Sequence, residues 1–187
     1  ELAALDRIRV PAQFVKQLPL PFSTVGAIRF RDQAQFHPLK FLAGISRGLR
    51  IYEHTSARAF YGNTVVTDGG KIYASKVIVA THFPMLNKHG GYFLKMYQDR
   101  SYVVAVERAQ NVNGMYLDES KQGLSFRNYG NLLLIGGGGH RTGKQGSAWS
   151  ELDAFAQRYY PKARVKYRWA AQDCMTLDGM PYIGQYS

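Results

Sequence analysis

Interpretation of the fold starts from Asp173-Cys174-Met175-Thr176-Leu177-Asp178-Gly179-Met180-Pro181-Tyr182-Ile183-Gly184. Within this stretch Asp178-Gly179 is a strong turn dipeptide, because glycine accepts a positive φ and the aspartate side chain can bond the backbone that follows it. Pro181 fixes its own φ and donates no hydrogen bond, so it stiffens the segment that follows. We therefore predict a tight turn that delivers a short rigid segment against another surface.

The composition indicates a globular protein. The chain has 187 residues, 45% of them hydrophobic, which allows one sizeable core or one and a half domains. Its net charge of +11 first suggests a nucleic-acid partner, but the basic residues are scattered, and we predict none. One alternation stands out, Lys162, Arg164, Lys166 and Arg168, which a regular strand would place on one face. We read it as a solvated face, or alternatively as a patch for a partner domain or a diphosphate.

Cysteine content and hydropathy limit the classes further. Cys174 is the only cysteine, which excludes an internal disulfide and a cysteine metal cluster, and we predict no metal site. A reduced, buried thiol is typical of a cytoplasmic protein, which we expect this to be. No apolar run approaches the ~18 residues of a membrane span, so we expect none. The start, Glu1–Asp6, does not resemble a signal peptide and is interpreted as a helix cut in mid-course.

Hydrophobic periodicity predicts many short strands and few helices. This balance favours an α+β fold with a mostly antiparallel sheet and flanking helices. The segment after the first helix is rich in proline and is predicted to be a connection. Helices are predicted over 1–9, 37–48, 84–96 and 147–160. Strands are predicted over 27–31, 50–55, 56–61, 64–67, 71–74, 76–80 (buried on both faces), 102–107, 114–118, 123–127, 131–135 and 164–170.

A glycine run follows the predicted strand 131–135. Gly136–Gly139 is predicted to be a loop, and Gly138 to Lys144 fits the phosphate-loop pattern, but Gln145 replaces the hydroxyl that would bind Mg²⁺. A nucleotide binder of this kind is therefore the least favoured interpretation. The glycines would otherwise let the backbone pass close to a cofactor or to a neighbouring loop. His140 and Arg141 are the polar groups that the run would present to a substrate.

Several segments, in order, resemble the D-amino-acid-oxidase and glycine-oxidase-like family of FAD-dependent oxidoreductases. Thr-x-Asp-Gly-x-Pro-x-Ile-Gly over 176–184 resembles the segment that approaches the flavin. Val77–His82 resembles the buried strand that ends in Ala-Thr-Gly, with His82 in place of the glycine. Ile51–Ala57 is similar to the strand that reads adenine, and 65–74 to the hairpin that follows it. Gln35–Pro38 resembles the entry to the preceding helix.

The resemblance implies a domain division and a cofactor. Residues 1–34 would be a truncated helix and connecting segment, 35–82 part of the FAD-binding α/β domain, 83–168 the strand-rich substrate domain, and 169–187 a truncated return to the FAD-binding domain. The chain lacks the family's Gly-x-Gly-x-x-Gly turn, so we expect FAD in the intact protein but not in this fragment, which would be inactive alone. The cofactor contacts implied by the resemblance are Ala57, Ala80, Thr81, His82, Pro181, Ile183 and Gly184.

The resemblance also bears on the substrate. Family members that oxidise amino acids carry an Arg after Trp-Ala-Gly-Leu to bind the substrate carboxylate, and Asp173 stands at that place here. An anion there favours a neutral or cationic amine, unless Asp173 only pairs with Arg168. His37, which precedes Pro38, either caps a helix or points into the substrate cleft. Substrate contacts are thus assigned to His37, His140, Arg141 and Asp173, with no catalytic residue identified. The main alternative is a non-catalytic binding domain that uses a basic face.

Overall fold

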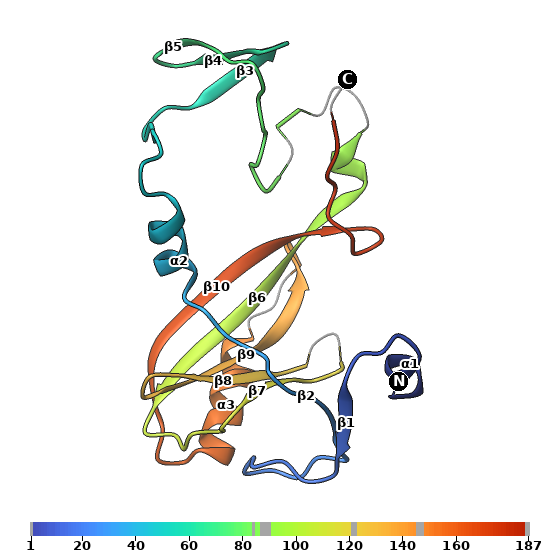
Figure 1. Ribbon diagram of the computed structural model, residues 1–187. Helices are drawn as coiled ribbons and strands as arrows, with labels where there is room; N and C mark the ends of the chain where they lie inside the picture. The colour runs from blue at the N-terminus through green and yellow to red at the C-terminus, as the bar shows by residue number, and fades with distance from the viewer. Residues whose placement is uncertain (1, 84, 87–90, 121–122, 145–147, 186–187) are drawn as a thin grey trace. The chain divides into compact units, whose positions relative to one another are not determined.

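The computed structural model describes residues 2–83, 85–86, 91–120, 123–144 and 148–185. The chain forms two compact units, each described here by itself. The larger unit consists of Glu1–Arg29 and His82–Ser187, and the smaller unit of Phe30–Thr81. Figure 1 labels the helices and strands of both. The fold is α+β with antiparallel sheets, as the sequence predicts.

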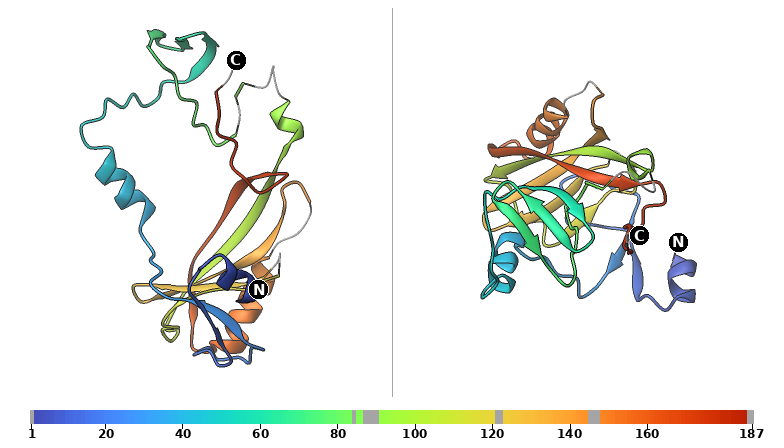
Figure 2. Two further views of the ribbon diagram at one scale, coloured as in Figure 1. Left: turned by 45° about the vertical axis from the view of Figure 1, so that its right-hand side comes forward. Right: turned by 90° about the horizontal axis from the view of Figure 1, so that it is seen from above.

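A five-stranded antiparallel sheet forms most of the larger unit, with strand order β10-β6-β9-β8-β7. Its two longest strands, β6 and β10, pair along almost their whole length, from Arg164 opposite Glu107 to Thr176 opposite Met96. The two lie side by side in both views of Figure 2. The predicted meander is confirmed only in part: β7, β8 and β9 pair consecutively, but β6 pairs with β9 and not with β7. The strand bounds are Met96–Glu107 (β6), Met115–Leu117 (β7), Ser125–Tyr129 (β8), Leu132–Arg141 (β9) and Arg164–Thr176 (β10).

Helix α3, Trp149–Tyr159, covers one face of this sheet and confirms the predicted amphipathic helix. Because side chains alternate along a strand, Val104 and Val106 of β6 point to the α3 face, where both are fully buried. Leu133 and Ile135 of β9 meet Leu152 of α3 in the same core. Burying each such side chain contributes roughly 1.5–3 kcal/mol. Three aromatic rings close one end of the core: Phe22, Phe126 and Phe155.

The first residues of the larger unit agree only partly with the expectations. Helix α1, Leu2–Arg7, lies within the predicted helix. The proline-rich connection contains a strand that we missed, β1 (Ala12–Val15), which pairs with the predicted β2 (Ala27–Phe30). The helix predicted over 84–96 lies partly outside the described residues. In the described part, only a 3₁₀ turn, η1 (Tyr92–Leu94), is helical, and Met96 already begins β6.

The smaller unit consists of one helix and a three-stranded antiparallel meander. Helix α2, Pro38–Ile45, begins where predicted, with Pro38 in its first turn. The predicted strands at 56–61, 64–67 and 71–74 correspond to β3 (Ala57–Tyr61), β4 (Thr64–Thr67) and β5 (Gly70–Tyr73). No residue of Phe30–Thr81, all of which the structure describes, is buried.

Two of the strands predicted in the smaller unit, 50–55 and 76–80, do not form. Residues 50–55 are irregular, with a turn at Glu53-His54, and His54 has a φ of 52°, which a strand does not tolerate. Residues 76–80 are extended but belong to none of the three sheets in the described chain, and Ile78 is 90% exposed. An apolar run becomes a strand only where another strand supplies hydrogen bonds, and here the described residues supply none.

The glycine run is not a loop, which contradicts the phosphate-loop interpretation. Gly136–Gly139 lies inside β9, and the strand continues to Arg141. Gly136 pairs with both β6 and β8, and Gly137 pairs with β6. Side chains on these glycines would collide with close neighbours. A Cβ at Gly136 would lie 2.6 Å from Ser125 Oγ, one at Gly137 would lie 2.6 Å from Leu124 Cδ2, and one at Gly138 would overlap Ala148 Cβ. The run therefore brings the backbone close to neighbouring segments, one of the two alternatives left open.

The basic alternation on β10 does not form one face. The pairing register with β6 shifts between Val165 and Tyr167, so that Arg164 lies opposite Glu107 but Arg168 lies opposite Val104. Such a bulge inserts one extra residue and reverses the side-chain alternation beyond it. Arg168 consequently reaches the α3 face, where its Nη2 lies 2.7 Å from Asp153 Oδ2. The continuous basic face on which the binding-domain alternative depended is absent. Strand β10 also runs six residues beyond the predicted end, 170, to Thr176.

Candidate functional site

Three of the predicted substrate residues come together at one end of the five-stranded sheet. His140 and Arg141 end β9, and Asp173 lies in β10; both strands flank β6. The fourth, His37, belongs to the smaller unit, and nothing places it relative to the other three.

Arg141 and Asp173 share the sheet face opposite α3. Asp99 of β6 is the common reference, because it lies opposite Asp173 on one side and opposite Arg141 on the other. Residues directly opposite each other in a sheet point to the same face, and strands lie about 4.8 Å apart, which places Arg141 and Asp173 about 10 Å apart. The row Asp173–Asp99–Arg141 thus carries two carboxylates and one guanidinium on one surface.

The charges in this row are not neutralised by one another. Among the described residues, no ion pair within 4.0 Å involves any of the three. The guanidinium of Arg141 instead lies over the ring of Tyr97, 5.3 Å from its centroid. Asp99 Oδ1 is buried and has no hydrogen-bond partner in the described structure. Like charges directly opposite each other destabilise a sheet, so Asp99 and Asp173 form a site that favours a cation.

His140 lies on the other face of the same sheet. It pairs opposite Arg100, and its ring contacts the buried Tyr102. Its Nδ1 is 3.0 Å from the carbonyl oxygen of Arg141, which can only accept, so Nδ1 donates. In the neutral ring Nε2 then accepts the hydrogen bond from Tyr102 Oη at 2.9 Å. Both ring nitrogens are therefore engaged within the protein.

Asp173 is not held by Arg168, which was the alternative to a substrate role. Arg168 pairs with Asp153, and Asp173 is exposed. Its neighbour Gln172 points to the α3 face, where its Nε2 donates to Thr142 Oγ1 at 3.0 Å. The carboxylate of Asp173 is consequently available on the opposite face.

The turn predicted at the start of the flavin segment forms as expected. Asp178 Oδ1 accepts a hydrogen bond from Met180 N at 3.1 Å, and Gly179 has a φ of 75°. The Tyr182 hydroxyl donates to the Lys95 carbonyl at 3.4 Å, which holds the segment against η1. Pro181, Ile183 and Gly184 follow in irregular, exposed backbone, and Ile183 is 90% exposed. Their assignment to a cofactor stays a prediction.

His82 retains the backbone conformation of the glycine that it replaces. Its φ is 62°, in the left-handed region that favours glycine. The departure from Ala-Thr-Gly thus leaves the local turn intact. Ala80 and Thr81 precede it in irregular backbone, and Ala57 begins β3 opposite Thr67. Ala57 is half-buried and the other three residues are exposed, and their assignment to a cofactor stays a prediction.

His37 caps helix α2. Its Nδ1 accepts a hydrogen bond from Lys40 N at 3.4 Å, and its φ and ψ of −92° and 109° are extended, as expected before a proline. The ring is half-buried. Capping was one of the two roles that the sequence left open, and a substrate role stays a prediction.

Asp99 and Tyr97 were not identified from the sequence. A signal was present, since alternation from the apolar run Val103–Val106 back to Tyr97 assigns odd-numbered residues to one face. Which residues of β9 and β10 they meet depends on the pairing register, which sequence alone does not define.

Other site types are not supported. No group of three or more His, Cys, Asp or Glu side chains within the described ranges could hold a metal ion. Within the same residues, no helix is long and apolar enough to cross a membrane.

The antiparallel sheet covered on one face by a helix, and the turn formed at Asp178-Gly179, agree with the resemblance to flavin-dependent oxidoreductases. The family model for FAD-dependent oxidoreductases of the DAO type matches residues 3–187. The chain belongs to that family.

Two solved structures share the fold. Glycine oxidase from Geobacillus kaustophilus superimposes with a TM-score of 0.75 at 22% identity, covering 98% of this chain and 56% of that one. L-proline dehydrogenase from P. horikoshii gives a TM-score of 0.78 at 16% identity, covering 100% and 59%.

A curated relative is closer in sequence. The Bacillus subtilis (strain 168) protein named "Putative Rieske 2Fe-2S iron-sulfur protein YhfW" is 33% identical over 205 aligned positions, covering all of this chain and 40% of the relative. The chain thus spans two fifths of that relative and somewhat more than half of the two structures.

Proposed function

We propose that the intact protein oxidises an amine with FAD, and that Asp173 and Asp99 together select neutral or cationic amines over simple α-amino acids. The observation that carries this is the pair of carboxylates on adjacent strands, where the resemblance implies a carboxylate-binding Arg. A bidentate Arg–carboxylate contact is about twice as strong as a neutral hydrogen bond, so its loss alone disfavours an amino acid. The two anions add repulsion.

The chemistry divides between cofactor and protein. FAD, when bound, would supply the acceptor for a hydride from the carbon next to the amine nitrogen, and the substrate would be left as an iminium ion. Asp173 and Asp99 attract the substrate nitrogen to this end of the sheet. They also favour the positive charge that develops on that nitrogen as the hydride leaves. No general base is required if the amine arrives neutral.

Arg141 is the residue that could oppose this preference. It lies on the same face, and its guanidinium could hold a carboxylate in place of the missing Arg. Its contact with Tyr97 sets it at the other end of the row from Asp173. A substrate with an amine at one end and a carboxylate about 10 Å away would satisfy both ends of the row.

Substrate profiling of the intact, FAD-loaded enzyme tests the proposal. Asp173→Arg should raise kcat/KM for glycine or a D-amino acid and lower it for a simple amine by about tenfold or more. Glu151→Gln, a charge removal on the exposed side of α3, serves as the control and should change neither. Efficient turnover of glycine or a D-amino acid by the unmodified enzyme, retained in Arg141→Ala, would contradict the proposal.

The name of the Bacillus subtilis relative suggests a second cofactor, a Rieske iron–sulfur centre. A Rieske [2Fe–2S] centre takes two cysteines and two histidines, and this chain has one cysteine. These 187 residues therefore cannot hold such a centre by themselves. If the intact protein contains one, we propose that it accepts electrons from the reduced flavin. Appearance of the electron paramagnetic resonance signal of a reduced [2Fe–2S] centre upon adding the amine would test this.

A further inference from the structure

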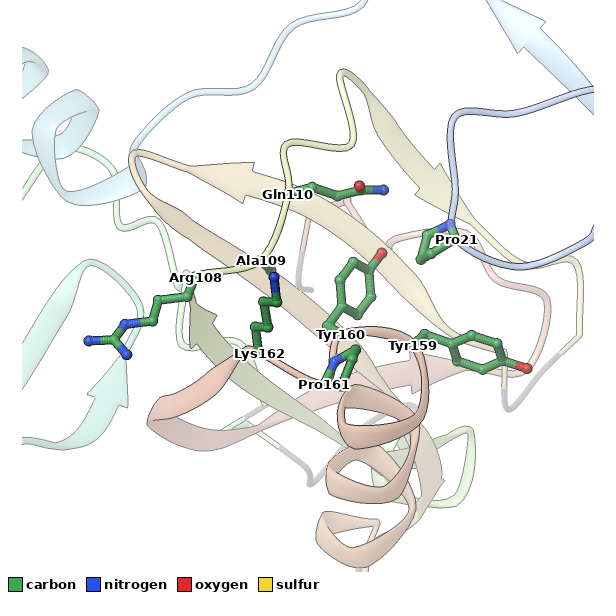
Figure 3. Close-up of a pocket in the computed structure, with 8 residues that line it drawn as sticks. All are labelled: Pro21, Arg108, Ala109, Gln110, Tyr159, Tyr160, Pro161 and Lys162. Atoms are coloured by element: carbon green, nitrogen blue, oxygen red, sulfur yellow. The ribbon is translucent and has the colours of Figure 1, made fainter.

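A pocket of about 240 Å³ opens at the end of β6 remote from Asp99. Eight residues line it, from the turn after β6, the end of α3 and the segment before β2, and all belong to the larger unit (Figure 3). Eight residues of β6 separate Asp99 from Glu107, roughly 27 Å along an extended strand. The pocket therefore lies far from the row Asp173–Asp99–Arg141. Its lining residues are Pro21, Arg108, Ala109, Gln110, Tyr159, Tyr160, Pro161 and Lys162.

Tyr160 brings an unsatisfied hydroxyl to this pocket. The side chain is only 5% exposed, and its Oη is buried without a hydrogen-bond partner among the described residues. A buried hydroxyl without a partner costs about 1–3 kcal/mol, so it signals a missing acceptor. Burial raises the pKa of Tyr160, and nearby Tyr116 raises it further, so the hydroxyl keeps its proton at neutral pH and can donate.

No acceptor of the described structure lies within hydrogen-bond distance of this hydroxyl. The lining residues contain no Asp or Glu, while Lys162 and Arg108 contribute positive charge. In Figure 3 the Lys162 side chain extends toward Ala109, whereas the Arg108 guanidinium points away from the pocket. The C-terminal carbonyls of α3 carry partial negative charge, which Lys162 offsets. A ligand that fits here must therefore supply an acceptor, and the local cation favours an anionic one.

The chemistry of the pocket walls indicates which kind of anion the pocket can bind. Pro21, Ala109, Pro161 and the tyrosine rings are largely apolar, so they suit a hydrocarbon body and leave most oxygens of a phosphate unpaired. We propose that this pocket binds a small organic acid, whose carboxylate accepts hydrogen bonds from Tyr160 and Lys162. Figure 3 shows Gln110 and Pro21 on the side to which the Tyr160 hydroxyl points, and Gln110 is exposed. In the proposed complex the carboxylate approaches the hydroxyl from this side.

Calorimetric titration of the full-length protein with butyrate tests the site. Butyramide has the same body without the charge and should bind at least about tenfold more weakly. Tyr160→Phe keeps the ring and removes the hydroxyl, and should weaken butyrate binding about fivefold. Lys162→Met should weaken it about tenfold or more.

Two matched variants serve as controls. Tyr159→Phe removes the neighbouring hydroxyl, which points away from the pocket in Figure 3, and Lys166→Met removes a lysine that pairs with Glu107 at 3.8 Å. Both should bind butyrate as the unmodified protein does. Asp173→Asn should also leave butyrate binding unchanged, which separates this site from the proposed amine site.

Three results would overturn the proposal. One is no detectable heat with butyrate, which would mean that ordered water satisfies the hydroxyl. Another is equal affinity of Tyr160→Phe, once its circular dichroism confirms the native fold. The third is binding of inorganic phosphate in preference to butyrate, which would indicate a site for an inorganic anion.

Discussion

The two units of this chain show two ways in which strands can be held. In the larger unit the five-stranded sheet is covered by α3, and every buried apolar residue of the described chain lies between Tyr102 and Tyr160. In the smaller unit a three-stranded meander has the same antiparallel pairing but no buried residue. Pairing alone satisfies backbone groups, whereas burial supplies most of the favourable free energy.

Local hydrogen bonds replace a core in the smaller unit. Ser56 N, just before β3, donates to Asp68 Oδ1 at 3.1 Å, and Asn63 Nδ2 donates to the carbonyl of Ser75, just after β5, at 3.0 Å. Each bond ties one end of the meander to one of its turns. Such exposed bonds contribute little net stability, about 0.5–1.5 kcal/mol each at most. The comparison therefore predicts two very different local stabilities in one chain.

The largest effect is expected when the same substitution, isoleucine to alanine, is compared between the sheets of the two units. Ile135→Ala empties a fully buried site in β9 and should cost about 3 kcal/mol, whereas Ile72→Ala in β5 changes a side chain that is 46% exposed and should cost under about 1 kcal/mol. Native-state hydrogen exchange of the β9 and β5 amides measures each effect locally. Equal costs would mean that the smaller unit has a core of its own.

The next effect concerns the glycines of β9. Gly138→Ala adds a methyl group against Ala148 at a φ of 63°, so both overlap and backbone strain should destabilise the larger unit, by about 2–3 kcal/mol. Gly143→Ala is the control, since Gly143 has a φ of 92° but no atom within 4 Å of the added Cβ. At position 143, backbone strain alone should lower the free energy of unfolding by about 1 kcal/mol. Chemical denaturation measures both, and similar losses would remove the packing argument for the glycine run.

A smaller effect is expected at His82, where the chain re-enters the larger unit. His82→Gly removes the strain of a left-handed φ, but it also gives the unfolded chain more conformational freedom. The two effects oppose each other, and the free energy of unfolding should rise by about 0.5–1 kcal/mol. Thr81→Gly has no left-handed strain to relieve and should lower stability. A loss of stability in His82→Gly would show that the imidazole makes contacts that outweigh the strain.

The last effect is a change in the pH dependence of stability. Near neutral pH, Tyr160→Phe removes the cost of a buried hydroxyl that has no partner among the described residues, so it should stabilise the larger unit, by no more than about 1–3 kcal/mol. Burial, with a contribution from Tyr116, raises the pKa of Tyr160 in the folded state, so folding holds this proton more tightly. The corresponding stability is present below the unfolded pKa of about 10 and is lost as the pH rises through the raised folded value. Tyr160→Phe should therefore flatten the alkaline loss.

Unfolding midpoints measured between neutral pH and the alkaline range test that slope. Tyr129→Phe is the matched control, because Tyr129 is 52% exposed and should leave the pH profile unchanged. A profile of Tyr160→Phe that falls as steeply as that of the unmodified protein would assign the alkaline loss to other groups.

The sequence was sufficient wherever the signal was local. The Asp178-Gly179 turn, the Pro38 start of α2 and the hairpins of β3 to β5 depend on φ preferences and short-range hydrogen bonds, and all form as predicted. The family could be identified for the same reason, because its motifs are turns and strand ends. Even the replacement at His82 preserves the turn.

Several features were decided only by the tertiary structure, because they depend on contacts between segments that are far apart in the sequence. The run 76–80 has strand-like composition but no partner strand in the described chain. Gly136–Gly139 has loop-like composition but lies within β9, where Ser125, Leu124 and Ala148 leave no room for side chains on its first three glycines. The bulge in β10 separated a basic stripe that perfect alternation would have kept together. The row Asp173–Asp99–Arg141 exists only through register. Composition and periodicity describe one segment at a time, but pairing and close approach are properties of two.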